Sequence, residues 1–219
     1  MERKTARMED PGAQLLDAMN SLWTRFGRVV LIGLGVVAIG VVGVLLTLRT
    51  RAAAEAQAAG RLAEGNLYFW QADYSRSLEI AKQTAGQWPG TYSGVDALRM
   101  AGDDEFWLGN FKNAVSEYRR YLDRRKTGLV ADAVRRSLAY ALEGDQQFKE
   151  AASTFEGLVG RFDRESSAEF LFSAARCQRA LNRPKEVERT LQRLVEEYGE
   201  TSYANRARIM RAELAAAPH

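Results

Sequence analysis

Histidine and cysteine, which most often supply catalytic bases, nucleophiles and metal ligands, occur once each in this 219-residue sequence, as His219 and Cys177. A nucleophilic triad or a histidine metal site needs a histidine among its other members, which a single one at the last position does not offer. Cys177 stands in a helical apolar pattern, so we expect a buried thiol that has no partner for an internal disulfide. These residues predict no enzyme, no cofactor and no metal site.

Asp103, Asp104 and Glu105 form a cluster of carboxylates that could in principle act on a substrate. Consecutive residues on a helix point in different directions, so we expect these side chains, like Glu196 and Glu197, to be solvated. The sequence also contains no glycine-rich phosphate-binding motif outside its most apolar segment. Function is therefore expected to lie in binding surfaces.

The charge of the chain is distributed unevenly. Residues 1–51 contain seven basic and four acidic residues, whereas residues 52–219 contain 24 of each sign. Binding of nucleic-acid phosphates needs a concentrated cationic surface, which a neutral domain without a basic stripe does not offer. We therefore expect no nucleic-acid partner.

The elements that would position a binding surface begin with a membrane-like segment. Residues 29–48 carry no charge, and fourteen of these twenty residues are Val, Leu or Ile. As a helix, the segment would reach about 30 Å, which is the thickness of a bilayer's hydrocarbon core. The sequence therefore predicts one transmembrane helix.

Two other interpretations of residues 29–48 are weaker. The apolar region of a cleaved signal peptide usually has about 7 to 15 residues, and this longer run is stopped by Arg49 and Arg51. Residues 52–54 are alanines that a signal peptidase could accept, so cleavage remains the competing interpretation. A buried core helix usually stops well short of this length. An uncleaved anchor is preferred.

Basic residues flank the predicted span on both sides, with more of them before it than after it. Lys and Arg are retained on the cytoplasmic side, so this difference predicts a cytoplasmic N-terminus and an extracytoplasmic C-terminal domain. The residues before the span are Arg3, Lys4, Arg7, Arg25 and Arg28, and those after it are Arg49, Arg51 and Arg61.

Residues 10–28 have an amphipathic pattern. Asp10 before Pro11 is a helix-start signal, and apolar residues then recur at helical spacing. With Trp23 near the span, the pattern indicates a short helix at the cytoplasmic membrane interface. A helix that simply continues into the span fits equally well, because Gly27 permits a bend without requiring one.

Small residues within the span fall roughly on one helical face, where they would let another helix approach closely. No strict GxxxG motif is present, so the prediction depends on their spacing alone. This candidate transmembrane packing face consists of Gly33, Gly40, Gly43 and Thr47.

The C-terminal part of the chain contains an internal repeat. Segments that start at Gly65, Gly102, Ala139 and Ala175 align with offsets of 37, 37 and 36 residues. Each opens with a small residue, where one helix must approach its neighbour closely, and has an aromatic residue or proline nine residues later. Those later positions are Tyr74, Phe111, Phe148 and Pro184. The junctions between units start at Gln87, Arg124, Arg161 and Glu197 and contain Thr or Ser, which favour helix N-caps.

This pattern resembles the tetratricopeptide repeat, in which a small residue in the first helix is followed by an aromatic, a small and a second aromatic residue. The resemblance covers about residues 55–217, and Ser77 and Pro184 depart from it in the terminal units. The second unit matches best, through Gly102, Gly109, Phe111, Ala114, Tyr118 and Leu122. The resemblance implies an all-α solenoid of about four helix-turn-helix units.

The first helices of a tetratricopeptide array line a concave groove, and the phase of the repeat implies which residues face it. Arginine and aromatic side chains, which are enriched at binding hot spots, dominate this set. A peptide or loop with carboxylates and apolar side chains would suit them, whereas Trp70 and Trp107 are expected in the inter-helix core. The candidate groove residues are Asn66, Phe69, Arg99, Asp103, Phe106, Arg136, Tyr140, Phe172, Arg176 and Arg179.

The whole chain would comprise a cytoplasmic segment with the amphipathic helix (1–28), the span (29–48), a linker or helix extension (49–60) and the repeat domain (61–217). This order is similar to that of bacterial envelope tetratricopeptide proteins, and above all to YfgM-type ancillary subunits of the secretion translocon. The resemblance implies an inner-membrane protein with a periplasmic repeat domain. It would be a scaffold or adaptor between an integral membrane complex, the lipid bilayer and unfolded or chaperone-bound envelope proteins. The alternative is a structural subunit of a large membrane assembly, such as a respiratory or photosynthetic complex.

Overall fold

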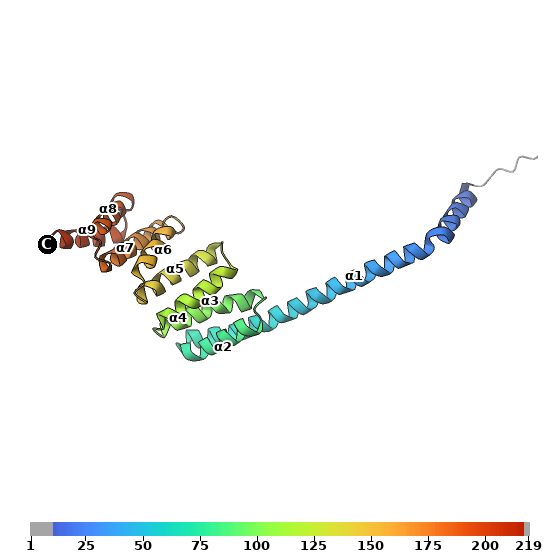
Figure 1. Ribbon diagram of the computed structural model, residues 1–219, viewed down its shortest axis with the longest axis horizontal. Helices are drawn as coiled ribbons and strands as arrows, with labels where there is room; N and C mark the ends of the chain where they lie inside the picture. The colour runs from blue at the N-terminus through green and yellow to red at the C-terminus, as the bar shows by residue number, and fades with distance from the viewer. Residues whose placement is uncertain (1–10, 217–219) are drawn as a thin grey trace, which may run out of the picture. The chain divides into compact units, whose positions relative to one another are not determined.

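The structure is a computed structural model that describes residues 11–216 (Figure 1). Every regular element in this range is a helix, which confirms the predicted all-α class. Several residues used in the sequence interpretation lie outside the described range: Arg3, Lys4, Arg7, Asp10, residue 217 and His219.

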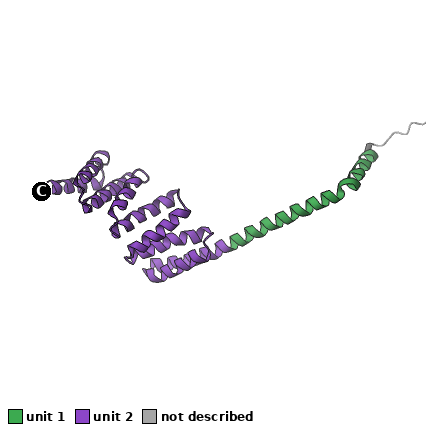
Figure 2. Cartoon of the chain, in the orientation of Figure 1, with its two compact units in different colours: residues 1–53 green, residues 54–219 purple. Residues whose placement is uncertain are grey.

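The chain divides into two compact units, residues 1–53 and residues 54–219 (Figure 2). Helix α1 (Pro11–Trp70) crosses this division, so residues 49–60 are helical. It contains the one described segment that is long and apolar enough to span a membrane, and none of its most apolar window is buried. A core helix of a soluble domain would be mostly covered, so the described residues do not support that interpretation.

Helix α1 is continuous from Pro11, so the described part of the predicted interfacial helix and the span belong to one helical element, and a position at the membrane interface stays a prediction. No proline stands between Gly12 and Trp70, so nothing removes a donor from the ladder of backbone hydrogen bonds. The Trp23 ring covers Gly27, and a Cβ at that position would lie 3.3 Å from Cδ2 of the ring. The ribbon of α1 bends in its N-terminal part (Figure 1).

The second unit consists of four helix pairs and a final helix that follow one another along the array (Figure 1). Each second helix begins at the aromatic residue or proline that the repeat predicted. The end of α1 pairs with α2 (Tyr74–Gln87), α3 (Tyr92–Trp107) with α4 (Phe111–Arg124), α5 (Leu129–Gly144) with α6 (Phe148–Leu158), and α7 (Arg164–Ala180) with α8 (Pro184–Glu197). Helix α9 (Ser202–Ala216) then packs on α7 and α8.

The turn inside each pair has the same backbone geometry. One residue two positions before the second helix has a positive φ, and the next N–H donates back to a carbonyl five residues earlier, as in a Schellman motif. The four left-handed residues are Ala72, Gly109, Gln146 and Asn182. Only one of them is glycine, so the tight turn is imposed by the packing of the two helices and not by glycine alone.

The helices of a pair approach closely at the predicted small residues. A Cβ at Gly65 would lie 3.3 Å from Cγ2 of Ile80 in α2, and a Cβ at Gly102 would lie 2.6 Å from Cδ1 of Tyr118 in α4. The corresponding Ala139 and Ala175 are completely buried. The expected close contact is therefore confirmed at the two glycines, and both alanines at the corresponding positions are buried.

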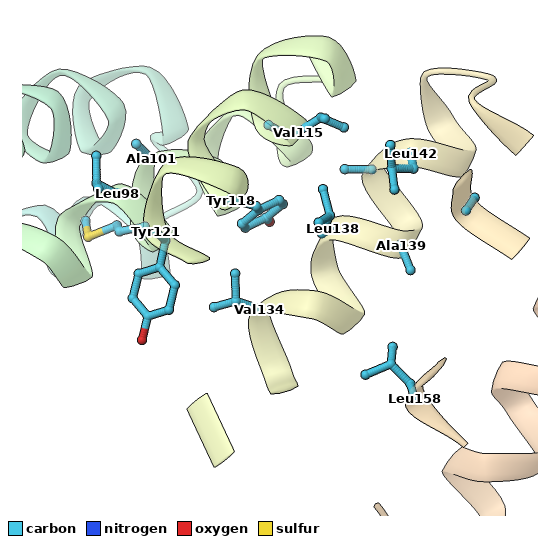
Figure 3. Packing of buried hydrophobic residues seen from close by; sticks show 14 of the residues in the cluster. Leu98, Ala101, Val115, Tyr118, Tyr121, Val134, Leu138, Ala139, Leu142 and Leu158 are labelled. Carbon is cyan, nitrogen blue, oxygen red and sulfur yellow. The ribbon is translucent and has the colours of Figure 1, made fainter. Parts of the chain in front are cut away.

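The core runs along the array between these helices. Tyr118, Phe155 and Phe170 are its largest fully buried side chains, and burying each such side chain stabilises the fold by roughly 1.5–3 kcal/mol. Cys177 is buried, as predicted. Figure 3 shows part of this core: Leu98, Ala101, Val115, Tyr118, Tyr121, Val134, Leu138, Ala139, Leu142 and Leu158.

The predicted N-caps are only partly present. Thr91 caps α3, where its side chain accepts a hydrogen bond from the N–H of Gly94. Helix α7 is capped by Asp163 instead of a Ser or Thr. Helix α5 follows Gly128, which has a positive φ and no side-chain cap. The junctions therefore share their position in the repeat but not one capping residue.

Gly102→Ala is expected to lower the free energy of unfolding by about 1–3 kcal/mol, because the added methyl overpacks the contact with Tyr118. Gly60→Ala, at an exposed position of α1 with open space around it, is expected to raise it by about 1 kcal/mol, since alanine favours the helix. Thermal unfolding of the full chain in detergent, followed by circular dichroism, measures both. Equal shifts for the two variants would contradict the role of Gly102 in close packing.

Candidate partner-binding groove

Four of the predicted groove residues meet in one pocket of about 260 Å³. Asp103 and Phe106 come from α3, and Arg136 and Tyr140 come from α5. The pocket is completed by four residues that the sequence interpretation missed: Trp107, Tyr118, Ser137 and Glu169. Glu169 lies one helical turn before Phe172 and Ser173, so spacing by three or four residues was the signal that could have found it.

The acidic residues of the pocket accept hydrogen bonds from within the protein. Tyr118 Oη donates to Asp103 Oδ1 at 2.8 Å, and Arg99 Nη1 donates to Asp103 Oδ2 at 2.7 Å. Burial raises the pKa of Asp103, and the charge of Arg99 opposes that shift. Tyr140 Oη donates to Glu169 Oε1 at 2.5 Å. Both carboxylates are thereby held in place by donors of the array.

Arg136 differs from the other arginines of the predicted groove. Its guanidinium lies over the Phe162 ring, 5.7 Å from the centroid, and among the described residues it has no hydrogen bond or ion pair. Arg176, in contrast, makes two 2.6 Å hydrogen bonds to Glu143. These bonds raise the pKa of Arg176, because they outweigh the opposing effect of its burial. Arg136 is exposed and its donors are free to bind an external acceptor.

The remaining arginines of the predicted groove also differ from Arg136, because they form ion pairs. Arg99 bonds to Asp96 at 2.9 and 3.0 Å as well as to Asp103, and Arg179 Nη1 lies 3.4 Å from Glu213 Oε2. These guanidinium groups already have carboxylate partners. Within the predicted groove set, the pocket between α3 and α5 therefore contains the one arginine without an acid partner in the described part of the chain.

The other predicted groove residues are used within the fold. Asn66 Nδ2 donates to the carbonyl of Leu62 in its own helix at 3.1 Å. Phe69 makes an edge contact with the Tyr74 ring, and Phe172 packs against Tyr203 with ring centroids 5.9 Å apart. None of these three lines the pocket.

Trp70 and Trp107 are exposed, which corrects their predicted place in the core. Their side chains are 83% and 60% exposed, because each lies in the last turn of a first helix, next to the tight turn. Trp107 stacks on Tyr74 with the ring planes 13° apart, and it also lines the pocket. An unbroken series of ring contacts leads to the pocket: Trp70, Phe69, Tyr74, Trp107, Phe106 and Phe111.

The acidic cluster is buried, which corrects the prediction of a solvated face. Asp104 is fully buried, and Ser77 Oγ donates to its Oδ2 at 2.9 Å, while its Oδ1 has no hydrogen-bond partner. Burial opposes ionisation of Glu105, but hydrogen bonds from Lys82 and Asn110 outweigh it and lower its pKa. These contacts join α2 to α3. The departure of Ser77 from the repeat pattern thus has a physical reason, since its hydroxyl donates a hydrogen bond to the buried Asp104.

The predicted transmembrane packing face is open. A Cβ at Gly33, Gly40 or Gly43 would meet no heavy atom within 4 Å. Thr47 Oγ1 donates to the carbonyl of Gly43 at 2.8 Å, so its hydroxyl is satisfied within the helix. Association of this face with another helix stays a prediction.

The described residues contain no group of three or more His, Cys, Asp or Glu side chains that could hold a metal ion. What they do contain is four pairs of antiparallel helices with one turn geometry and a small residue at the same position of each first helix. These features define an array with the tetratricopeptide-like repeat fold, whose concave surface is extended and suited to binding other molecules.

Comparison with solved structures supports this fold. The chain is similar to the nearly identical TPR-like repeats of a Podosopora anserina protein, with a TM-score of 0.58 and 16% identity over 74% of this chain and 91% of that chain. A tetratricopeptide repeat protein from Parabacteroides merdae has a TM-score of 0.59 and 15% identity over 72% and 58% of the two chains. A MamA double mutant from RS-1 has a TM-score of 0.54 and 15% identity over 64% of this chain and 74% of that chain. No protein-family model and no curated protein matches the sequence.

Asp104→Asn is expected to stabilise the protein at pH 8 by an amount on the order of 1 kcal/mol. Burial raises the pKa of Asp104 to about 7, whereas an unfolded aspartate titrates near 4. The folded chain therefore binds more protons between these values, and its stability falls as pH rises from about 4 to about 7. Asparagine removes this ionisation cost, so the difference between variant and parent grows across that range.

Denaturant unfolding of the full chain at a series of pH values measures this difference. Asp123→Asn is the matched control, because Asp123 is an exposed carboxylate of α4. The control is expected to show no such pH-dependent gain. A gain at Asp104 that is the same at pH 5 and pH 8 would show that ionisation of the buried carboxyl is not its cause.

Proposed function

We propose that this chain is a non-enzymatic, single-pass membrane-anchored scaffold that binds a partner protein in the pocket between α3, α5 and α7. The observation that carries the proposal is the pairing of the free Arg136 guanidinium with the exposed Trp107 ring in one concave site. Trp and Arg are the residues most enriched among binding hot spots. The array supplies the concave surface, and these two side chains supply the unsatisfied contacts.

The chemistry of the pocket favours a segment with a carboxylate next to an aromatic or aliphatic side chain. Asp103 and Glu169 already accept internal hydrogen bonds, so the charge left without a partner is the positive charge of Arg136. A carboxylate would make charge-assisted hydrogen bonds to its guanidinium. An apolar side chain of the same segment would cover Phe106 and Trp107 and continue along the exposed rings toward Trp70.

The apolar segment of α1 supports the anchor. We place it in a bacterial inner membrane with the N-terminus in the cytoplasm and the repeats in the periplasm, as the flanking basic residues and the resemblance to YfgM-type translocon subunits suggest. The small-residue face would contact an integral membrane complex, and the pocket would receive a segment of that complex, an envelope client or a chaperone.

One observation favours a second function, that of a fixed structural subunit in a large membrane assembly. Residues 49–60 are helical and contain no glycine or proline before Gly60. A chain that captures exchanging clients would gain reach from a flexible linker at this point. Extraction of the tagged full chain in mild detergent, with mass spectrometry across a salt series, separates the two. Stoichiometric subunits that resist salt indicate a fixed subunit, and substoichiometric proteins lost with salt indicate an adaptor.

Arg136→Gln is expected to weaken the complex with the main co-purified protein by about 10- to 100-fold, because one charge-assisted contact is lost. Binding of the purified partner to the full-length variant measures the change. Arg189→Gln is the matched control, since Arg189 is exposed on α8, lies outside the pocket and makes no ion pair with a described residue. Equal affinity of the two folded variants would reject the role of Arg136.

A further inference from the structure

The junction between α4 and α5 is unlike the other described junctions. It reads Arg124, Arg125, Lys126, Thr127, Gly128 and then Leu129 and Val130. Three consecutive cations are thus followed by two apolar residues that are 75% and 42% exposed. We call residues 124–130, which run from the last residue of α4 to the first two residues of α5, the basic–apolar loop. The cations of the next junction, in comparison, are ion-paired: Arg161 with Asp132 and Arg164 with Glu200.

Within the described range, no cation of this loop forms a hydrogen bond or ion pair with a carboxylate, although the hydrogen bonds of Ser93 and the nearby charge of Arg125 lower the pKa of Glu55. Arg124 and Lys126 make no side-chain hydrogen bond or ion pair, and Arg125 lies over the Tyr92 ring, 4.5 Å from its centroid. The loop is nevertheless held in shape, because Arg135 donates to the carbonyl of Lys126. Asp123 precedes the loop in the sequence and Glu55 lies near Arg125, so three cations and two carboxylates leave a local charge of about +1.

The loop belongs to the end of the array where the membrane segment joins it. Glu55 accepts hydrogen bonds from the N–H groups of Tyr92 and Ser93 at 2.6 and 3.0 Å, and Arg125 stacks on the same Tyr92. Glu55 is seven residues after Leu48, the last residue of the apolar run. Seven residues reach at most about 25 Å even when fully extended, whatever the orientation of the repeats.

From this arrangement we propose that the basic–apolar loop binds the surface of the membrane in which α1 is anchored. Arg124, Arg125 and Lys126 contact anionic lipid headgroups, and Leu129 and Val130 enter the headgroup region. Cations next to exposed apolar side chains are the two components of interfacial membrane binding. Attachment to the span keeps the loop near the bilayer at high effective concentration, so a weak contact suffices. The inference rests on the proposed anchor and adds a second contact with the same membrane.

The contact would restrict the orientation of the repeat unit. A span and a surface loop fix two points of the chain at the membrane, whereas a span alone leaves the array free to rotate. The pocket with Arg136 would then be presented to partners in a limited range of directions. The concave groove of a tetratricopeptide-like array would not by itself restrict the orientation of the array at the membrane.

The test uses the full chain in vesicles of phosphatidylcholine alone or mixed with phosphatidylglycerol, with quencher-labelled lipids. Leu129→Cys carries an environment-sensitive fluorophore. Cys177 does not compete for the label, because it is buried and burial raises the pKa of its thiol to about 12. Ile209→Cys is the matched control, since Ile209 is an exposed apolar residue on α9.

Lipid quenching is expected to be stronger for the label at position 129 than at position 209, and to increase with phosphatidylglycerol. Arg124→Gln combined with Lys126→Gln should lower the equilibrium constant for binding of the loop to the membrane surface by about fivefold for each charge removed. Equal quenching at the two positions, or no dependence on phosphatidylglycerol, would overturn the proposal. Alkaline extraction of the same vesicles tests the anchor separately, because release of the chain would reject the span and not the loop.

Discussion

The distance between the two helices of each repeat is the constraint on which the rest of this protein depends. Gly65, Gly102, Ala139 and Ala175 let the backbones approach, and that approach brings the next helix into reach of the core. It also explains why Ala72, Gln146 and Asn182 accept a left-handed conformation that costs roughly 1 kcal/mol each. The packing energy of the helices exceeds the local strain of the turns that join them.

The same contact reaches the candidate binding pocket. Tyr118 packs against Gly102 with its ring and donates a hydrogen bond to Asp103 with its hydroxyl. One side chain therefore belongs both to the core and to the pocket. Specificity and stability are coupled at this point, because a change in helix spacing would displace the carboxylate that Arg99 and Tyr118 hold.

Most of the fold could be predicted from the sequence, and the reason is repetition. Offsets of 37, 37 and 36 residues identify the helix pairs, and the structure starts each second helix at the predicted residue. The candidate site was harder to predict, because the phase of the repeat indicates which face of a helix a residue lies on but not which side chains it contacts. Nothing in the phase distinguishes Arg136, which has no acid partner, from Arg176, which bonds to Glu143. Burial of Asp104 depends on neighbours from another repeat, such as Ser77, which local patterns do not contain.

The order of contacts along the array has a consequence for biosynthesis. Each helix packs mainly on the helices next to it in the sequence, so the closing loops are short and no contact waits for a distant part of the chain. The first repeat begins within α1, directly after the apolar segment. The chain can therefore fold repeat by repeat as it is synthesised, with α9 added last to cover the apolar face that α7 and α8 leave open.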